Sequence, residues 1–301
     1  MHQKKIIDLV ESKSEILKKT GYSITKKTSL QYGEKIFFTK NSETAALVIY
    51  WSSKKGFSFV LEGNFSSKEE LVAIFKGEDL SLHSGVTEFN QYVGMDESGK
   101  GDFFGPLVAA GFYCKKNDLK NLMKAGVRDC KKLTNRNTLE IAQVLRSQYH
   151  ENIRTVCLMP EEYNVKYEEF TQKGLKLNSM LGNLYAILIN DFENSTLQPD
   201  GYYIDRFGDE KFVISQLTKK IKLKMDINAE VDMAVAAASI IARAVFLEKI
   251  QELSQILGEN IPLGAGAPVD TFAKKYIKPL TPDKRSQFIK VHFKSTEKMF
   301  Q

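Results

Sequence analysis

The sequence predicts a two-domain protein, in which a small α+β domain precedes a larger α/β domain with a central mixed sheet flanked by helices. The chain has 301 residues, more than the roughly 100–200 residues of a typical domain. Residues 1–85 differ in composition from the rest, with 13 lysines, no arginine and the only tryptophan. We therefore expect domains at residues 1–85 and 92–301, joined by a linker at 86–91.

The first domain begins with a helical pattern and continues with strands. Ile6, Val10 and Leu17 recur at helical spacing. β-branched and aromatic runs predict strands at 35–39, 46–52 and 57–62. A second helix follows, in which Ser67 and Glu70 have the form of a capping box. The order helix, strands, helix predicts a small antiparallel sheet.

The second domain mixes strand and helix patterns along its whole length. Strands are expected at 92–96, 107–114, 154–158 and 202–205. Helices are expected at 135–149, 176–192 and 232–253. This mixture predicts an α/β domain with a central mixed sheet.

The composition excludes several classes of protein. Hydrophobic residues make up 43% of the chain and charged residues 27%, which is ordinary for a globular protein. No stretch approaches the roughly 18 apolar residues of a membrane span, and the three cysteines form no Cys-x-x-Cys pair. We expect a cytoplasmic protein without membrane association, disulfide framework or zinc site. The net charge of +6 permits a polyanionic partner.

Two neighbouring carboxylates end the first strand of the second domain. Asp96 and Glu97 are followed by the flexible turn Gly99-Lys100-Gly101. Adjacent carboxylates repel each other unless a cation lies between them, and Mg²⁺ takes oxygen ligands from carboxylates and substrate phosphates. The alternative interpretation is an ordinary charged turn that leaves a strand.

Further acids occur at two later positions. Asp205 ends another apolar strand and could face Asp96 if the two strands are parallel neighbours; a solvated aspartate paired with Arg206 is the alternative. Glu230 and Asp232 precede an alanine-rich helix, and Asp232 could equally be its N-cap. Four carboxylates around two divalent ions suit phosphoryl displacement, which indicates a nuclease.

Five segments, in a fixed order, resemble the bacterial ribonuclease HIII branch of the type 2 ribonuclease H family. They are Gly94–Pro106, Arg128–Leu133, Ile204–Phe207, Ala229–Arg243 and Val291–Lys294. The Asp-Phe-Phe-Gly run at 102–105 is typical of HIII rather than HII. The N-terminal module resembles the TATA-binding-protein-like substrate-binding domain of HIII members, and the second domain resembles the ribonuclease H-like catalytic domain.

The resemblance implies an endonuclease, expected to be a monomer, that hydrolyses the RNA strand of RNA–DNA hybrids with two Mg²⁺ or Mn²⁺ ions. The products would carry 5′-phosphate and 3′-hydroxyl ends. It implies four metal-binding catalytic acids, namely Asp96, Glu97, Asp205 and Glu230. It also implies substrate contacts at Gly99, Lys100, Gly101 and Lys131, where the glycine turn reads the ribose and Lys131 contacts a phosphate.

Some residues depart from the family pattern, and two other functions stay open. Cys130 stands where serine is common, Arg206 stands where glutamine is more usual, and a short loop leaves Asp232 as a rival to Glu230. His292 could lie near the site or make a structural hydrogen bond. The alternatives are a hybrid-binding or RNA-binding protein without activity, and a related two-metal DNA nuclease.

The first domain offers residues that could grip a hybrid. Lys54 and Lys55 occupy a turn, and Tyr50, Trp51 and Phe57 are candidates for exposed strand positions. Such a surface would contact phosphates and read the shape of the duplex. The alternative is that these aromatic residues belong to the core of the domain.

Overall fold

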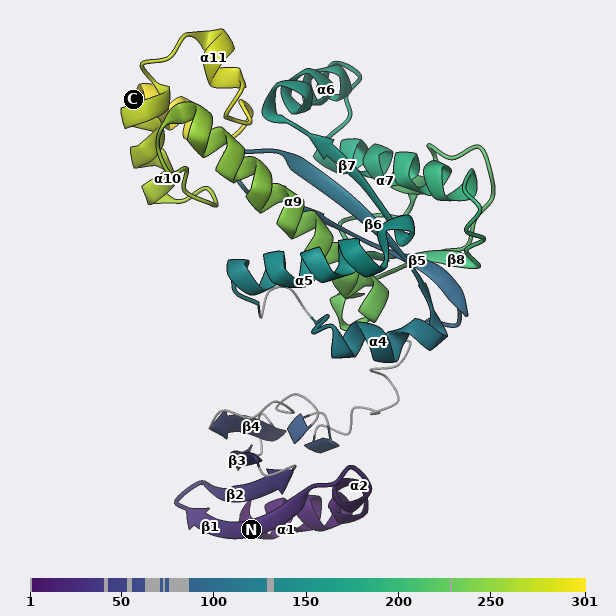
Figure 1. Ribbon diagram of the computed structural model, residues 1–301. Coiled ribbons are helices and arrows are strands. Elements are labelled where there is room, and N and C mark those ends of the chain that lie inside the picture. Colours follow the sequence, from purple (N-terminus) through teal and green to yellow (C-terminus); the bar gives the residue numbers. More distant parts are fainter. Residues whose placement is uncertain are drawn as a thin grey trace. The chain divides into compact units, whose positions relative to one another are not determined.

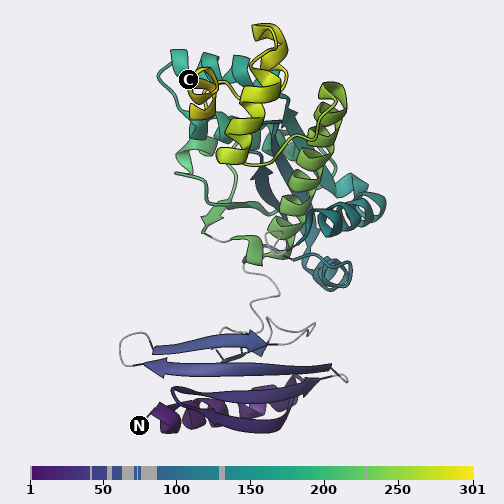
Figure 2. The ribbon, with the colours of Figure 1, turned by 90° about the vertical axis from the view of Figure 1, so that its left-hand side faces the viewer.

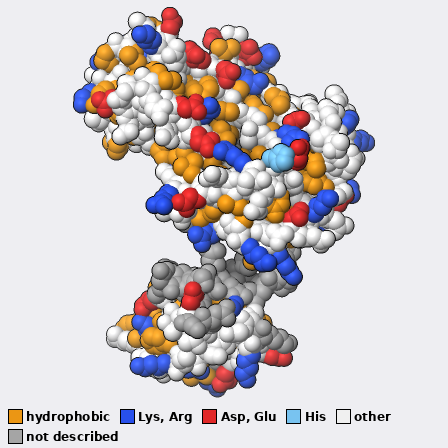
Figure 3. Space-filling model, in the orientation of Figure 1, with side chains coloured by type: hydrophobic (Ala, Val, Ile, Leu, Met, Phe, Trp, Pro, Cys, Tyr) orange, Lys and Arg blue, Asp and Glu red, His pale blue; other side chains and the backbone are white. Residues whose placement is uncertain are grey.

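The computed structural model describes residues 2–40, 43–52, 56–62, 71–72, 74–75, 87–128, 133–227 and 229–301 (Figure 1). The chain divides into two compact units, Met1–His83 and Ser84–Gln301, and each is described by itself. Among these described segments, no helix is both long enough and apolar enough to cross a bilayer. Acidic, basic and apolar side chains are interspersed over the face of the second unit that Figure 3 shows, so charge alone marks no binding surface there.

The first unit contains the predicted antiparallel sheet, which has four strands where the sequence indicated three (Figure 2). Its strands, in spatial and chain order, are β1 (Ser23–Leu30), β2 (Gly33–Lys40), β3 (Glu43–Ser52) and β4 (Gly56–Glu62). Helices α1 (His2–Ser12) and α2 (Ser14–Lys19) contribute Ile6, Val10 and Leu17 to its core. Strand β1 was not predicted, because all its residues are exposed and its Lys and Thr side chains show no apolar alternation.

The aromatic residues of the first unit divide between the two faces of its sheet. Trp51 and Phe57 are register partners and pack against the core, and the Lys5 ammonium lies 4.3 Å from the centroid of the Trp51 ring. Tyr50, one residue earlier in the strand, is 37% exposed. The core interpretation therefore holds for Trp51 and Phe57. Four residues named above, Lys54, Lys55, Ser67 and Glu70, lie outside the described residues.

The second unit has the predicted central mixed sheet, with five strands in the order β7-β6-β5-β8-β9. Their bounds are β5 (Gln91–Ser98), β6 (Leu107–Lys115), β7 (Ile153–Leu158), β8 (Gly201–Asp205) and β9 (Leu223–Asp226). Strand β5 pairs antiparallel with β6 and parallel with β8, and β8 pairs parallel with β9. Strand β9 was not predicted, because it has only four residues and includes Lys224 and Asp226.

Helices cover both faces of this sheet (Figure 1). One face packs against α4 (Leu119–Lys124), α5 (Asn135–Gln148) and α9 (Met233–Leu257). The other face packs against α6 (Pro160–Gln172) and α7 (Leu177–Glu193). Shorter helices are α8 (Lys211–Ile214), α10 (Ala267–Phe272), α11 (Pro282–Ser286) and α12 (Lys294–Phe300).

Helix α9 lies unusually close to β5, as its run of small residues predicts. A Cβ atom placed on Gly94 would lie 2.2 Å from the backbone of Ala234 and Val235, so only glycine fits at this crossing. The Asp232 side chain caps the helix by accepting hydrogen bonds from the N–H groups of the same two residues. This contact fixes the start of α9 beside the strand that carries Asp96.

Residues 87–91, within the predicted linker, pack on the second unit. Phe89 is 5% exposed and belongs to the core under α9. The Asp200 carboxylate accepts hydrogen bonds from the N–H groups of Asn90 and Gln91, the latter being the first residue of β5. The division between the units, after His83, precedes this segment. The segment 87–91 belongs to the larger unit because Phe89 buries apolar surface there. The local sequence pattern did not reveal this burial.

Candidate functional site

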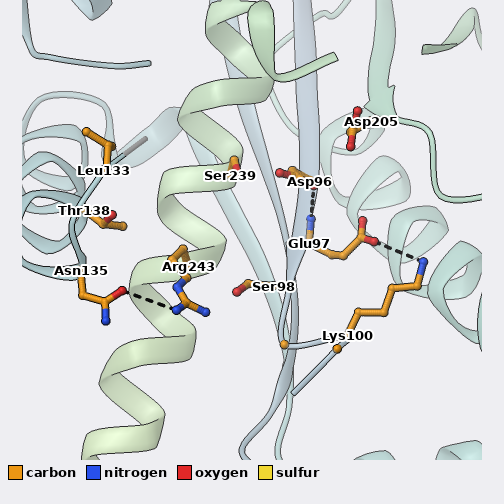
Figure 4. Close-up of a pocket in the computed structure, with 12 residues that line it drawn as sticks. Asp96, Glu97, Ser98, Lys100, Leu133, Asn135, Thr138, Asp205, Ser239 and Arg243 are labelled. Carbon is orange, nitrogen blue, oxygen red and sulfur yellow. Dashed lines mark hydrogen bonds and ion pairs between the residues drawn. The ribbon is translucent and has the colours of Figure 1, made fainter. Parts of the chain in front are cut away.

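Two neighbouring strands bring Asp96, two residues before the end of β5, and Asp205, the last residue of β8, to the same edge of the sheet. Strands β5 and β8 are parallel neighbours, as expected, and Met95 is the register partner of Ile204. Asp96 and Asp205 are the next residue of each strand. Because parallel strands end at a common edge, both carboxylates emerge at the crevice where α/β sheets bind ligands (Figure 4).

A pocket of about 570 Å³ lies at this edge of the sheet. Its wall consists of Asp96, Glu97, Ser98, Gly99, Lys100, Gly101, Leu133, Asn135, Thr138, Asp205, Ser239 and Arg243. Six of these residues were predicted as site residues: Asp96, Glu97, Gly99, Lys100, Gly101 and Asp205. The others come mainly from α5 and α9. Ser98, Leu133, Ser239 and Arg243 lie within segments that resemble the family but were not singled out as site residues, and Asn135 and Thr138 lie outside those segments. In Figure 4, Asp205 and Arg243 lie on opposite sides of β5.

The environment of Asp96 opposes its negative charge. Burial and, to a lesser extent, the neighbouring Glu97 carboxylate raise the pKa of Asp96 to about 8. A hydrogen bond with the Ser239 side chain acts in the opposite direction. The Glu97 N–H also donates to Asp96 Oδ1 at 2.8 Å. A positive charge in the pocket would favour the ionised form of this acid.

Glu97 is held by two side chains. The Tyr185 hydroxyl, on α7, donates to Glu97 Oε2, and the Lys100 ammonium lies 3.6 Å from Oε1. Burial raises the pKa of Glu97, while these two partners lower it. The Tyr185 ring packs against Phe207 with 5.1 Å between ring centroids. Tyr185 was not predicted, because a tyrosine in an apolar helix is indistinguishable in sequence from a core residue.

Asp205 is joined to the turn before α9. Its Oδ1 accepts a hydrogen bond of 2.8 Å from the N–H of Ala229, the first residue of a short 3₁₀ turn (Ala229–Val231). The Arg206 guanidinium donates to the carbonyl oxygen of Met225 at 3.0 Å. Arg206 thus supports the neighbouring strand β9.

The two candidates for the fourth acid have different environments. Asp232 is 1% exposed; its Oδ1 caps α9, and its Oδ2 accepts a hydrogen bond of 2.6 Å from the Tyr92 hydroxyl. Both of its oxygens therefore already have partners, one at the start of α9 and the other on β5. Glu230 is 7% exposed on the 3₁₀ turn, and the pocket wall formed by the described residues does not include it.

The chemistry of the acids fits a divalent cation. In the described part of the chain, no three His, Cys, Asp or Glu side chains already converge as a complete metal site. Asp96, Glu97 and Asp205 nevertheless line one pocket, and their mutual repulsion contributes to the raised pKa of Asp96. A hard divalent cation removes that repulsion, and carboxylate oxygens are the ligands that Mg²⁺ and Mn²⁺ prefer. The donor set therefore fits such an ion.

The turn after β5 depends on Gly99. Its φ is +87°, and a Cβ atom there would lie 2.1 Å from the carbonyl oxygen of Pro106, so both the backbone conformation and the packing require glycine. The N–H of Asp102 closes the turn by donating to the Gly99 carbonyl at 3.2 Å. A Cβ atom on Gly101 would meet nothing within 4 Å, so the turn presents open backbone. Cys130 and Lys131 lie outside the described residues.

Comparisons with known proteins agree with this architecture. The family model of ribonuclease HII matches residues 93–296. Ribonuclease HIII of Chlamydia caviae is 32% identical in an alignment of 300 residues that covers 96% of this chain and 91% of the relative. Ribonuclease HIII of Bacillus cereus is 34% identical over 215 residues, 69% of this chain and 68% of the relative.

Solved structures share the fold. The structure of Bst-RNase HIII in complex with Mn²⁺ has a TM-score of 0.65 at 24% identity, covering 95% of this chain and 96% of that one. Ribonuclease HII in the PCNA complex from Archaeoglobus fulgidus has a TM-score of 0.54 at 25% identity, covering 70% and 97%. Since the family match contains the strands of Asp96 and Asp205 together with α9, and relatives named ribonuclease HIII cover nearly the whole chain, this chain belongs to the ribonuclease HII and HIII family of ribonuclease H enzymes.

Proposed function

We propose that this protein is an endonuclease that hydrolyses the RNA strand of RNA–DNA hybrids with two Mg²⁺ or Mn²⁺ ions, leaving 5′-phosphate and 3′-hydroxyl ends. One observation carries the proposal: two parallel strand ends and a glycine turn place three carboxylates in one pocket. Membership of the family, and a solved relative whose structure is a complex with Mn²⁺, support it.

Asp96, Glu97, Asp205 and Glu230 are the proposed metal ligands. When bound, two divalent cations make a water nucleophilic and stabilise the departing 3′ oxygen. The protein contributes the orientation of the acids. Ser239 orients Asp96, Tyr185 and Lys100 orient Glu97, and the Ala229 N–H orients Asp205.

Glu230 is the better candidate for the fourth acid. Asp232 uses both of its oxygens to hold α9 and Tyr92, so binding an ion would cost it these hydrogen bonds. Glu230 follows Ala229, whose N–H is bonded to Asp205. The turn that carries Glu230 is thus tied directly to the third acid.

The rest of the pocket suits a nucleic acid strand. The open backbone at Gly101 lets a ribose approach the turn, and the 2′-hydroxyl distinguishes RNA from DNA. Lys100 and Arg243 supply positive charge on the pocket wall. Lys131 remains a proposed phosphate contact. The proposal further assigns residues 1–85 as a hybrid-binding domain, joined through 86–91 to the catalytic domain 92–301 of a cytoplasmic monomer.

Cleavage by an Asp205→Asn variant tests the proposal. Labelled hybrid, duplex DNA and duplex RNA are incubated with wild type, with this variant and with Asp209→Asn, which alters an exposed acid paired with Lys211 in the same loop. We expect wild type and Asp209→Asn to cut only the RNA of the hybrid, and only with Mg²⁺ or Mn²⁺. Asp205→Asn should lose more than about a hundredfold in rate, since even the partners of metal ligands are worth about 10–100-fold.

Two outcomes would contradict the proposal. Wild-type activity in Asp205→Asn would remove this acid from the site. Tight binding of the hybrid without cleavage by the wild-type protein would instead favour a hybrid-binding protein, and preferential cutting of duplex DNA would favour a related two-metal DNA nuclease.

A further inference from the structure

Lys290 is a fully buried lysine outside the carboxylate pocket. It lies between α11 and α12, and none of its surface is exposed. Its ammonium group donates to the carbonyl oxygens of Asp102 at 2.9 Å and Gly105 at 2.7 Å, and it lies 3.5 Å from that of Phe104. Burying a cation is costly unless it is hydrogen-bonded, so this residue is placed there for a reason other than apolar packing.

The peptide groups that Lys290 meets are fixed on their other side as well. Because a trans peptide is planar, its carbonyl and N–H point in opposite directions. The Phe103 N–H donates to Gly264 at 2.9 Å, and the Gly105 N–H donates to Phe288 at 3.1 Å. The carbonyl of Gly105 precedes Pro106, which has no N–H. Residues 102–105 are thus held between the loop at Gly264 and the segment before α12.

This held segment supports the turn that carries Gly99, Lys100 and Gly101. The carbonyl of Pro106 lies so close to Gly99 that no Cβ atom fits between them. The Asp102 N–H closes the turn on the Gly99 carbonyl. A shift of residues 102–106 therefore moves the turn directly.

We propose that Lys290 is a positioning residue for the substrate-facing turn Gly99–Gly101: by holding the carbonyls of Asp102 and Gly105 it keeps the turn in the shape that meets the hybrid. Lys290 does not itself touch the substrate. The inference rests on the proposed function, because it assigns to the turn the recognition of the RNA strand.

Two other residues provide a second variant and a control. The Asn164 side chain, on α6, hydrogen-bonds the backbone on both sides of Lys290. It donates to the Ile289 carbonyl at 2.9 Å and accepts from the Val291 N–H at 3.0 Å. Asp270 on α10 accepts hydrogen bonds from Ser295 at 2.5 Å and Lys298 at 2.8 Å, and so anchors α12 without contacting residues 102–106.

The test compares full-length Lys290→Met, Lys290→Arg, Asn164→Ala and Asp270→Asn with wild type. The measurements are kcat and KM on a labelled hybrid, the Mg²⁺ concentration for half-maximal rate, the dissociation constants for the hybrid and for duplex DNA in EDTA, and the melting temperature. We expect Lys290→Met to raise KM by roughly tenfold, the size of one well-made hydrogen-bonded contact. The Mg²⁺ requirement should stay unchanged, and affinity should fall for the hybrid but not for duplex DNA.

The variants distinguish a positioning role of Lys290 from a general loss of stability. Asn164→Ala should raise KM in the same direction by a smaller factor, Lys290→Arg should recover part of the loss, and Asp270→Asn should lower the melting temperature with KM unchanged. An unchanged KM in folded Lys290→Met overturns the inference. If Lys290→Met does not fold, an unchanged KM in Asn164→Ala overturns it. Wild-type protein that cuts no hybrid would instead refute the proposed function.

Discussion

At the scale of single residues, each acid of the pocket has a neighbour that fixes its orientation. The Tyr185 hydroxyl, the Ser239 side chain and the Ala229 N–H bind Glu97, Asp96 and Asp205 respectively. Hydrogen bonds to ligand carboxylates both orient them and tune their charge. Catalysis should therefore respond to residues that contact neither metal nor substrate.

Tyr185→Phe tests this at Glu97. The variant keeps the ring packed against Phe207 and removes only the hydroxyl that donates a hydrogen bond to Glu97. We expect kcat to fall by about 10–100-fold and the Mg²⁺ requirement to rise, in steady-state assays and calorimetric metal titrations. The matched control is Tyr202→Phe, which removes a hydroxyl bonded to Glu193 at 2.8 Å, outside the pocket. Equal effects of the two variants would contradict an orienting role for Tyr185.

Lys290 should leave a signature in the pH dependence of stability. Burial lowers the pKa of its ammonium to about 7, against a lysine pKa near 10.4 in an unfolded chain. Between these values the unfolded chain binds more protons, so the free energy of unfolding increases with pH. In urea denaturation, we expect wild type to gain roughly 2–4 kcal/mol relative to Lys290→Met between about pH 7 and pH 9.5.

The groups that face Lys290 do not obscure this signature. Burial raises the pKa of the Cys157 thiol to about 11 and raises that of Tyr163, and it lowers the pKa of His292 to about 4, so all three stay neutral in the folded protein across the range. Their titration in the unfolded chain is common to wild type and Lys290→Met and cancels in the comparison. The negative charge of Asp102 acts against burial and raises the pKa of Lys290. A stability difference that stays constant with pH would show that Lys290 keeps its proton throughout.

At the scale of elements, the approach of α9 to β5 determines the geometry of the pocket. Gly94→Ala should destabilise the protein by about 1–3 kcal/mol, because the added methyl meets the backbone of Ala234 and Val235, which cannot rotate away. Thermal and urea denaturation measure the loss. Gly266→Ala is the control, since its methyl would make only an ordinary contact of 3.8 Å with Pro268. A Gly94→Ala variant as stable as this control would mean that α9 moves aside freely.

Most long elements were predictable because their patterns are local. The strands β2 to β8 are rich in β-branched and aromatic residues, and a run of alanines indicates α9. β1 and β9 were missed because the first is wholly exposed and the second is very short. Edge strands of this kind receive their structure from hydrogen bonds with a neighbour rather than from their own apolar pattern.

The residues of the candidate site were likewise predictable only where they belong to a local sequence pattern. Strand-end acids such as Asp96 and Asp205 stand beside a recognisable apolar run, so their position in the fold follows from the sequence. Tyr185 lies outside the segments that resemble the family, and only the packing of α7 brings its hydroxyl to Glu97. Side chains that act through tertiary contacts leave no spacing signal.

At the scale of the whole molecule, the two units have separate cores. Ile36, Phe38 and Leu47 belong to the core of the first unit, and none of the described residues of that unit contributes to the two cores of the second. Each unit therefore satisfies the usual condition for folding alone. Interactions with a long substrate can then be distributed over both.

Deletion of residues 1–83 tests the proposed role of the first unit. We expect Ser84–Gln301 to keep its fold and cut the hybrid with a higher KM. The dependence of binding on salt should be less steep, because a lysine-rich unit that releases counterions has been removed. Circular dichroism checks the fold, and titration of a labelled hybrid at several salt concentrations measures the slope. Unchanged affinity and slope would assign the unit to another partner.

The parallel pairing of β5 with β8 also has a kinetic consequence. It joins segments from distant parts of the chain, and the described residues between them form β6, β7 and the α-helices α4, α5, α6 and α7. Such non-local pairing closes a long loop and forms slowly compared with local helices. During refolding from denaturant, helical circular dichroism should return ahead of cleavage, because a chain with its helices formed but these two strands still apart has no assembled set of acids.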